Sequence, residues 1–206
     1  IAVLAIRTSA IEKADTIDQW QKRTGFYTDL NVNSNTPALE IKNFVPKEAI
    51  IDISRYCSGG KINWKAPKGE WTIYRFGYNL IGRQNGPVEK DGKGLEADKL
   101  SHRAMSNYYH DYLKLMDEAS GHRLGKSVKY MLIDSYEAGK GTWTDLMCEE
   151  FRNRRGYDII PWLPILIGIP VGSMGETADF LFDWRITLGE MIAEYHYKLA
   201  AETAAE

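Results

Sequence analysis

Short segments of alternating apolar and polar residues occupy the first part of the chain. They fall at residues 50–53, 61–64 and 71–78, and turns containing glycine and proline separate them. A period of two places successive side chains on opposite faces of a sheet, and glycine and proline favour turns between strands. The pattern therefore predicts that residues 1–82 form an antiparallel, β-rich module.

A helical period replaces the alternation after residue 82. Ser101 is a suitable N-cap for a helix that ends at Gly121, and its predicted buried face carries Met105, Tyr109, Tyr112 and Met116. From about residue 178 a second long helix is predicted by apolar residues at spacings of three and four: Leu181, Trp184, Leu188, Met191, Tyr195 and Leu199. These side chains are more typical of packing on a core than of a binding site.

The apolar run at residues 128–133 lies between the two helices and predicts a buried parallel strand. Helix, strand and helix in this order are typical of an α/β fold, and we expect residues 83–206 to form part of a (β/α)8 TIM-type barrel. A complete barrel needs about 250 residues. We therefore expect the chain to be a fragment, with the β-rich module inserted in the barrel or packed on it.

Asp134 and Glu137 directly follow the predicted strand. Loops at the carboxyl ends of parallel strands form the active face of barrels and open sheets, so carboxylates at this point are aimed at a pocket. Trp143 follows a few residues later, and an indole beside carboxylates suits a sugar, whose C–H face is apolar while its hydroxyls need acceptors. The structural alternative is that Asp134 caps a turn, Glu137 is solvated and Trp143 only packs.

Composition excludes several classes of protein. The formal charge of -2 and the sequence pI of about 6.1 give no basic surface for nucleic acid. The apolar segment 159–171 is too short for a membrane span and contains three prolines, so a buried, kinked connection is expected instead. Cys57 and Cys148 are too few for a disulfide framework, although a single bridge stays open.

Other catalytic and cofactor motifs are weak or missing in the sequence. It has no Gly-x-Ser-x-Gly elbow, His-Glu-x-x-His pair or Walker loop, and the four histidines lack metal-ligand spacing, which favours surface or packing roles for them. Residues 92–97 echo a dinucleotide fingerprint without a strand before them, so no nucleotide cofactor is expected. No basic segment followed by an apolar core, the pattern of a signal peptide, opens the chain.

Several motifs, in their order and spacing, resemble glycoside hydrolase family 106, the α-L-rhamnosidases and related bacterial enzymes. The motifs are Asn63 to Tyr78, Gly94 to Ser101, Asp134-Ser135-Tyr136-Glu137, Trp143-Thr144, and Glu150 to Asp158 followed by Pro161 and Leu163-Pro164. The resemblance covers most of the chain. It implies a barrel enzyme that removes terminal α-L-rhamnosyl residues from plant or bacterial polysaccharides with inversion, and that uses calcium to recognise sugar hydroxyls. It also implies a secreted or periplasmic parent protein.

On this resemblance, Glu137 is the expected general base. Asp134, Tyr136, Trp143 and Asp98 are expected to bind the sugar, and Glu96 and Asp98 are candidate metal ligands. Capping and solvation are the structural alternative for the last two. Facing carboxyls normally come from different barrel strands, so the general acid is expected on a missing barrel segment.

The expected partners are a carbohydrate and the missing barrel segments of the parent chain, with a second copy of this chain as a further candidate. A competing hypothesis from another class is a non-catalytic carbohydrate-binding or structural fragment of a larger glycosidase. Lack of an opposed acid in the chain favours this alternative, whereas the carboxylates at the strand end favour the enzyme.

Overall fold

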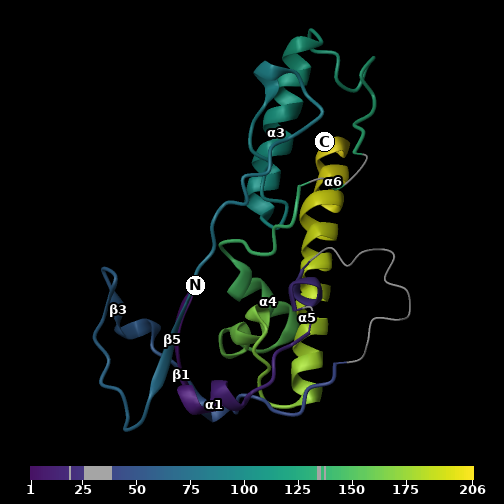
Figure 1. Cartoon of the computed structure of the whole chain (residues 1–206). Coiled ribbons are helices and arrows are strands. Elements are labelled where there is room, and N and C mark those ends of the chain that lie inside the picture. The colour runs from purple at the N-terminus through teal and green to yellow at the C-terminus, as the bar shows by residue number, and fades with distance from the viewer. Residues whose placement is uncertain (19, 26–38, 134–135, 137) are drawn as a thin grey trace. The chain divides into compact units, whose positions relative to one another are not determined.

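The computed structural model describes residues 1–18, 20–25, 39–133, 136 and 138–206 (Figure 1). It is a mixed α/β structure that divides into two compact units. The first unit contains Ile1–Asn79 and Cys148–Thr187, and the second contains Leu80–Met147 and Leu188–Glu206. The division passes through the long helix α5 (Met174–Ile192).

A three-stranded antiparallel sheet forms the centre of the first unit. Strand β1 (Ala2–Arg7) lies in the middle, between β2 (Ile50–Asp52) and β5 (Trp71–Phe76). In this register Ala5 faces Ile51 on one side and Ile73 on the other. A small hairpin pairs β3 (Cys57–Ser58) with β4 (Lys61–Ile62). The predicted antiparallel sheet is thus confirmed.

The other elements of the first unit pack around a buried aromatic core. Phe151 on α4 (Met147–Arg155) contacts Tyr157 and Phe180, and Phe180 stacks on Trp162. Trp162 belongs to the 3-10 helix η4 (Ile160–Ile167), which confirms the kinked, buried connection expected there. The short helices of this unit are α1 (Thr8–Lys13), α2 (Trp20–Thr24), η1 (Lys47–Ala49) and η2 (Ser54–Tyr56).

Helix α3 (His102–Ala119) is the main helix of the second unit. The hydroxyl of Ser101 accepts a hydrogen bond from the N–H of Ala104 at 3.2 Å, which confirms the predicted N-cap. Met105 and Tyr109 on α3 are buried with Leu199 and Ala200, whereas Tyr112, expected on the same face, is exposed. Leu199 begins α6 (Leu199–Ala205), which follows the π-helix η5 (Ala193–Lys198); the unit also contains the 3-10 helix η3 (Lys90–Gly92).

The prediction of a buried parallel strand at 128–133 is wrong for the residues described. These residues belong to none of the strands, and only an isolated bridge joins Val128 to Leu124. Tyr130 and Leu132 are 93% and 88% exposed, while Met131 and Ile133 pack against the Met105 cluster. The physical reason is that a parallel strand needs neighbouring strands for its hydrogen bonds, and the described part of the second unit contains none. The residues that the structure describes therefore do not show a barrel.

Two further features bear on the expectations from composition. Cys57 and Cys148 are both free thiols. Among the described residues, no helix combines the length and the apolar character that a membrane crossing requires.

Candidate functional site

The predicted site residues that the structure describes all belong to the second unit. They are Glu96, Asp98, Tyr136 and Trp143. Asp134 and Glu137, the predicted sugar ligand and general base, lie outside the described residues. Their assignment therefore stays a prediction.

Asp98 connects two segments that are more than forty residues apart in sequence. Its Oδ2 accepts a hydrogen bond from the hydroxyl of Thr144 at 2.7 Å, and its Oδ1 accepts one from the N–H of Leu100 at 3.0 Å. Thr144 is buried, so this bond to a carboxylate is shielded from water. The contact brings the Gly94–Ser101 segment to the Trp143-Thr144 pair, which the sequence had placed in one site without showing how they meet.

Glu96 forms an ion pair with Lys99, whose Nζ lies 2.8 Å from its Oε2. The pair is largely buried, since the side chain of Lys99 is 10% exposed and that of Glu96 is 20% exposed. An ammonium group at this distance neutralises the carboxylate. Glu96 and Asp98 are thus both engaged by protein groups, Glu96 by a cation and Asp98 by two donors.

Calcium needs six to eight oxygen ligands. No cluster of three or more histidine, cysteine, aspartate or glutamate side chains suited to a metal occurs among the described residues. The described side chains by themselves do not fit a calcium ion, because Lys99 competes with any cation at Glu96.

His196 is a buried polar residue that the sequence reading placed among packing or surface histidines. It lies on the π-helix η5 and is only 5% exposed. The hydroxyl of Tyr109 lies 2.5 Å from its Nδ1 and donates a hydrogen bond to its main-chain carbonyl at 3.0 Å. The pKa of His196 is lowered to about 4, chiefly by burial and also by the charge of Lys99, while the charge of Glu96 acts in the opposite direction. The imidazole is therefore neutral at pH 7.

Tyr136 joins this cluster from the segment that carries the predicted carboxylates. Its ring meets the imidazole of His196 edge to face, with centroids 6.3 Å apart and an interplanar angle of 75°. Such a geometry is favourable for aromatic pairs. Tyr136 is thus a described residue of the predicted site that contacts His196, which in turn is hydrogen-bonded to Tyr109.

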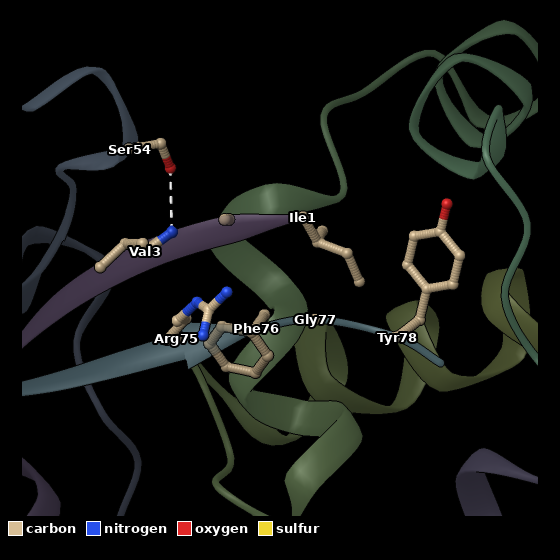
Figure 2. Close-up of a pocket in the computed structure, with 8 residues that line it drawn as sticks. Ile1, Val3, Ser54, Arg75, Phe76, Gly77 and Tyr78 are labelled. Atoms are coloured by element: carbon tan, nitrogen blue, oxygen red, sulfur yellow. Dashed lines mark hydrogen bonds between the residues drawn. The ribbon is translucent and has the colours of Figure 1, made fainter. Parts of the chain in front are cut away.

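A hollow of about 330 Å³ in the first unit is separate from the predicted site (Figure 2). It lies at the ends of β1 and β5, where the N–H of Val3 donates a hydrogen bond to the hydroxyl of Ser54 at 2.9 Å. Arg75 and Tyr78 also line it. None of the predicted site residues contributes to it, so the hollow does not support the proposed sugar chemistry.

Comparison with known proteins identifies the family. The profile of the alpha-L-rhamnosidase family, glycoside hydrolase 106, matches residues 3–206. The chain belongs to this family. The resemblance stated from the sequence motifs is thereby confirmed, and the family supports a glycoside hydrolase as the parent protein.

Two relatives of the family 106 chain show how much of a longer protein it corresponds to. It is 37% identical over 164 residues to a protein of Formosa agariphila named "Putative beta-glucuronidase", a match that covers 79% of the chain and 14% of the relative. The solved structure of a rhamnosidase from Novosphingobium sp. PP1Y superposes with a TM-score of 0.83 at 32% identity, covering 92% of the chain and 19% of that protein. The chain thus spans less than a fifth of either relative.

Proposed function

We propose that this chain is part of a glycoside hydrolase that removes terminal α-L-rhamnosyl residues from plant or bacterial polysaccharides with inversion of configuration. The observation that carries the proposal is the family match over residues 3–206. The likeness to a solved rhamnosidase, at a TM-score of 0.83, supports the same sugar class.

In the proposed reaction, Glu137 takes a proton from the water that attacks the anomeric carbon. A second carboxyl group protonates the departing glycosidic oxygen, and inversion requires the two carboxyls to stand about 6.5–9.5 Å apart to leave room for that water. Asp134 lies only three residues from Glu137, so the second carboxyl is assigned to another barrel strand, outside this chain. Asp134 binds a sugar hydroxyl or orients Glu137.

The described residues are proposed to hold the sugar. The indole of Trp143 offers an apolar face for its C–H groups, while the Asp98 carboxylate has lone pairs beyond those used by Thr144 and Leu100. Tyr136 adds a phenol from the Asp134–Glu137 segment. Calcium binding is a proposal that rests on the family resemblance alone. It would need ligands beyond Glu96 and Asp98, and metal analysis of the purified protein tests it.

The remaining barrel segments are proposed as the structural partners of the chain, within a parent protein that is secreted or periplasmic. The outward side chains of Tyr130 and Leu132 support this proposal, because a barrel strand would bury such side chains against its neighbours. A second copy of the chain is the competing occupant. Size-exclusion chromatography of the chain and of the longer protein distinguishes the two.

A non-catalytic carbohydrate-binding or structural fragment is the second candidate for the chain alone. The observation in its favour is that the two described carboxylates of the predicted site are both engaged by protein groups: Glu96 pairs with Lys99, and Asp98 accepts from Thr144. Under this alternative the purified chain binds rhamnose-containing glycans without turnover. The longer protein decides between the candidates.

The test is hydrolysis of aryl α-L-rhamnosides by the longer protein, with aryl β-D-glucuronides in parallel because one relative is named as a glucuronidase. Glu137→Gln should preserve binding and lower kcat by roughly 10² to 10⁴, the usual contribution of a positioned acid or base. Glu149→Gln, at an exposed position on α4, is the matched control and should leave kcat unchanged. Cleavage of glucuronides alone, or full activity in Glu137→Gln, would contradict the proposal, and NMR of the first-formed anomer tests inversion.

A further inference from the structure

Tyr136 stands in sequence between the two carboxylates predicted to act on the sugar. Asp134 precedes it by two residues, and Glu137, the predicted base, directly follows it. A contact that restrains the Tyr136 side chain therefore also restrains the backbone next to the base. Such a restraint affects the rate, since a misplacement of about 1 Å at a reacting group can cost about a hundredfold.

His196 provides a contact of this kind. Its imidazole meets the ring of Tyr136 edge to face, with centroids 6.3 Å apart, in a geometry favourable for aromatic pairs. The side chain is buried and belongs to the π-helix η5, and π-helical turns are frequent at functional sites. The two residues are far apart in sequence but belong to the same compact unit, so the fold brings them together.

Tyr109 fixes the orientation of the His196 ring. Its hydroxyl has one proton, which it donates to the main-chain carbonyl of His196 at 3.0 Å. The Nδ1 atom of His196, 2.5 Å from the same oxygen, is therefore the N–H that donates to Tyr109. The two rings also lie nearly parallel, at 14°. Because Tyr109 is itself buried with Met105 and Leu199, the imidazole is held from the helix core.

The other ring nitrogen of His196 takes no part in this arrangement. Its Nε2 atom is buried and has no hydrogen-bond partner among the residues described. In the neutral imidazole this nitrogen carries a bare lone pair, so it donates nothing to its neighbours. The described residues therefore use the flat ring of His196 and its Nδ1–H group, and a carbon atom in place of Nε2 would break none of their hydrogen bonds.

We propose that His196 is a positioning residue for the predicted base: its ring, oriented by Tyr109, holds Tyr136 and thereby the adjoining Glu137. The inference rests on the proposed function, which assigns proton transfer to Glu137. His196 transfers no proton itself. Loss of the ring contact lets the base shift away from the attacking water, which weakens the transition state while the bound sugar keeps its own contacts. Such a change lowers kcat and kcat/KM by the same factor and leaves KM nearly constant.

Two substitutions at His196 separate its ring from its hydrogen bond. His196→Asn keeps an amide N–H for Tyr109 but has no ring, and kcat for an aryl α-L-rhamnoside should fall roughly tenfold to a hundredfold at a nearly constant KM. His196→Phe keeps the ring and loses the Nδ1–H group, so its kcat should lie nearer the wild-type value. An equal loss of kcat in the two variants, with circular dichroism and thermal melting showing both folded, would overturn the inference.

A matched pair of variants at Tyr136 tests the contact from its other side. Tyr136→Phe and Tyr136→Leu both lack the phenol proposed to bind the sugar, so both should raise KM, whereas only Tyr136→Leu loses the ring and should lower kcat. In a His196→Asn background the two should have equal kcat, because the contact that distinguishes them is already absent. A difference in kcat that persists in this background would contradict the proposed role of His196.

His102 offers a control of the same chemistry. Its ring meets that of Tyr195 edge to face, with centroids 5.5 Å apart and an interplanar angle of 89°, in the same unit and away from Tyr136 in sequence. His102→Asn removes a histidine–tyrosine contact that does not involve the Tyr136 segment. It should leave kcat unchanged, and a loss equal to that of His196→Asn would show that the effect is not specific to the predicted base.

An activity-independent measurement keeps this inference separate from the proposed function. Crystal structures of the longer protein should show the Cα atom of residue 137 displaced in His196→Asn and at its wild-type position in Tyr136→Phe. If the wild-type protein hydrolyses no rhamnoside, the proposed function fails, yet the position of this atom still decides whether His196 holds the segment. The same position in wild type and His196→Asn would show the inference to be wrong.

Discussion

The buried imidazole of His196 should make the stability of the protein depend on pH. The ordinary pKa of histidine is 6.5, and burial lowers that of His196 to about 4 in the folded state. At about 1.4 kcal/mol for each pKa unit, the difference corresponds to about 3 kcal/mol of folding free energy. A 5% exposed side chain has little solvent to reduce this effect.

The sign follows from proton binding. Between pH 6.5 and pH 4 the unfolded chain protonates His196 and the folded chain does not, so acid favours unfolding. Stability should therefore be unaffected by His196 above about pH 7 and fall progressively as the pH decreases to about 4. Below that value both states carry the proton, and this contribution stops changing.

Urea unfolding of wild type and His196→Gln between pH 7.5 and pH 4 measures the effect. The difference between the unfolding free energies of the two proteins should change by about 3 kcal/mol over this range. Groups that titrate equally in both proteins do not contribute to this difference. His110→Gln is a useful control, because a hydrogen bond to the Ser106 carbonyl raises the pKa of exposed His110 and so predicts the opposite slope. Parallel curves for wild type and His196→Gln would refute the reasoning.

Three further predictions concern the same unit. Met105→Ala should lower the unfolding free energy by about 2–5 kcal/mol in urea denaturation, because Met105 is fully buried and its loss leaves a cavity; a loss below about 1 kcal/mol would contradict this packing. Thr144→Val should cost about 1.5–3 kcal/mol by leaving the Asp98 carboxylate short of a donor, whereas Thr144→Ser should restore most of it. Ser101→Ala should lower the thermal midpoint in proportion to a capping loss of about 1 kcal/mol, and an unchanged midpoint would show that the cap contributes nothing.

Local sequence patterns predicted those elements whose stability depends on near neighbours. The alternation at 50–53 and 71–78 correctly predicted strands β2 and β5, and Ser101 correctly predicted the start of helix α3. Strand β1 carries no alternation, because Leu4, Ala5 and Ile6 are all buried and a central strand can be apolar on both faces. No local rule distinguishes such a run from a buried helix.

The candidate site was less accessible to sequence reasoning. The motifs indicated that Asp98 and Trp143-Thr144 belong to one site. The Asp98–Thr144 hydrogen bond, however, joins residues more than forty positions apart, and only the tertiary fold brings them together. The apolar spacing of three and four predicts Tyr195, and not His196, on the buried face of the C-terminal helix. The structure buries His196 more deeply than Tyr195, and the wider turns of η5 change which side chains face the core.

The exposed side chains of Tyr130 and Leu132 also affect how the protein can be handled. Residues 128–133 form a short run rich in β-favouring apolar side chains, and two of its largest side chains face solvent. Such a run is a template for pairing with identical runs on other molecules. A sample of these 206 residues alone should therefore self-associate as its concentration rises. A longer expressed segment that covers Tyr130 and Leu132 should remain monomeric at the same concentration.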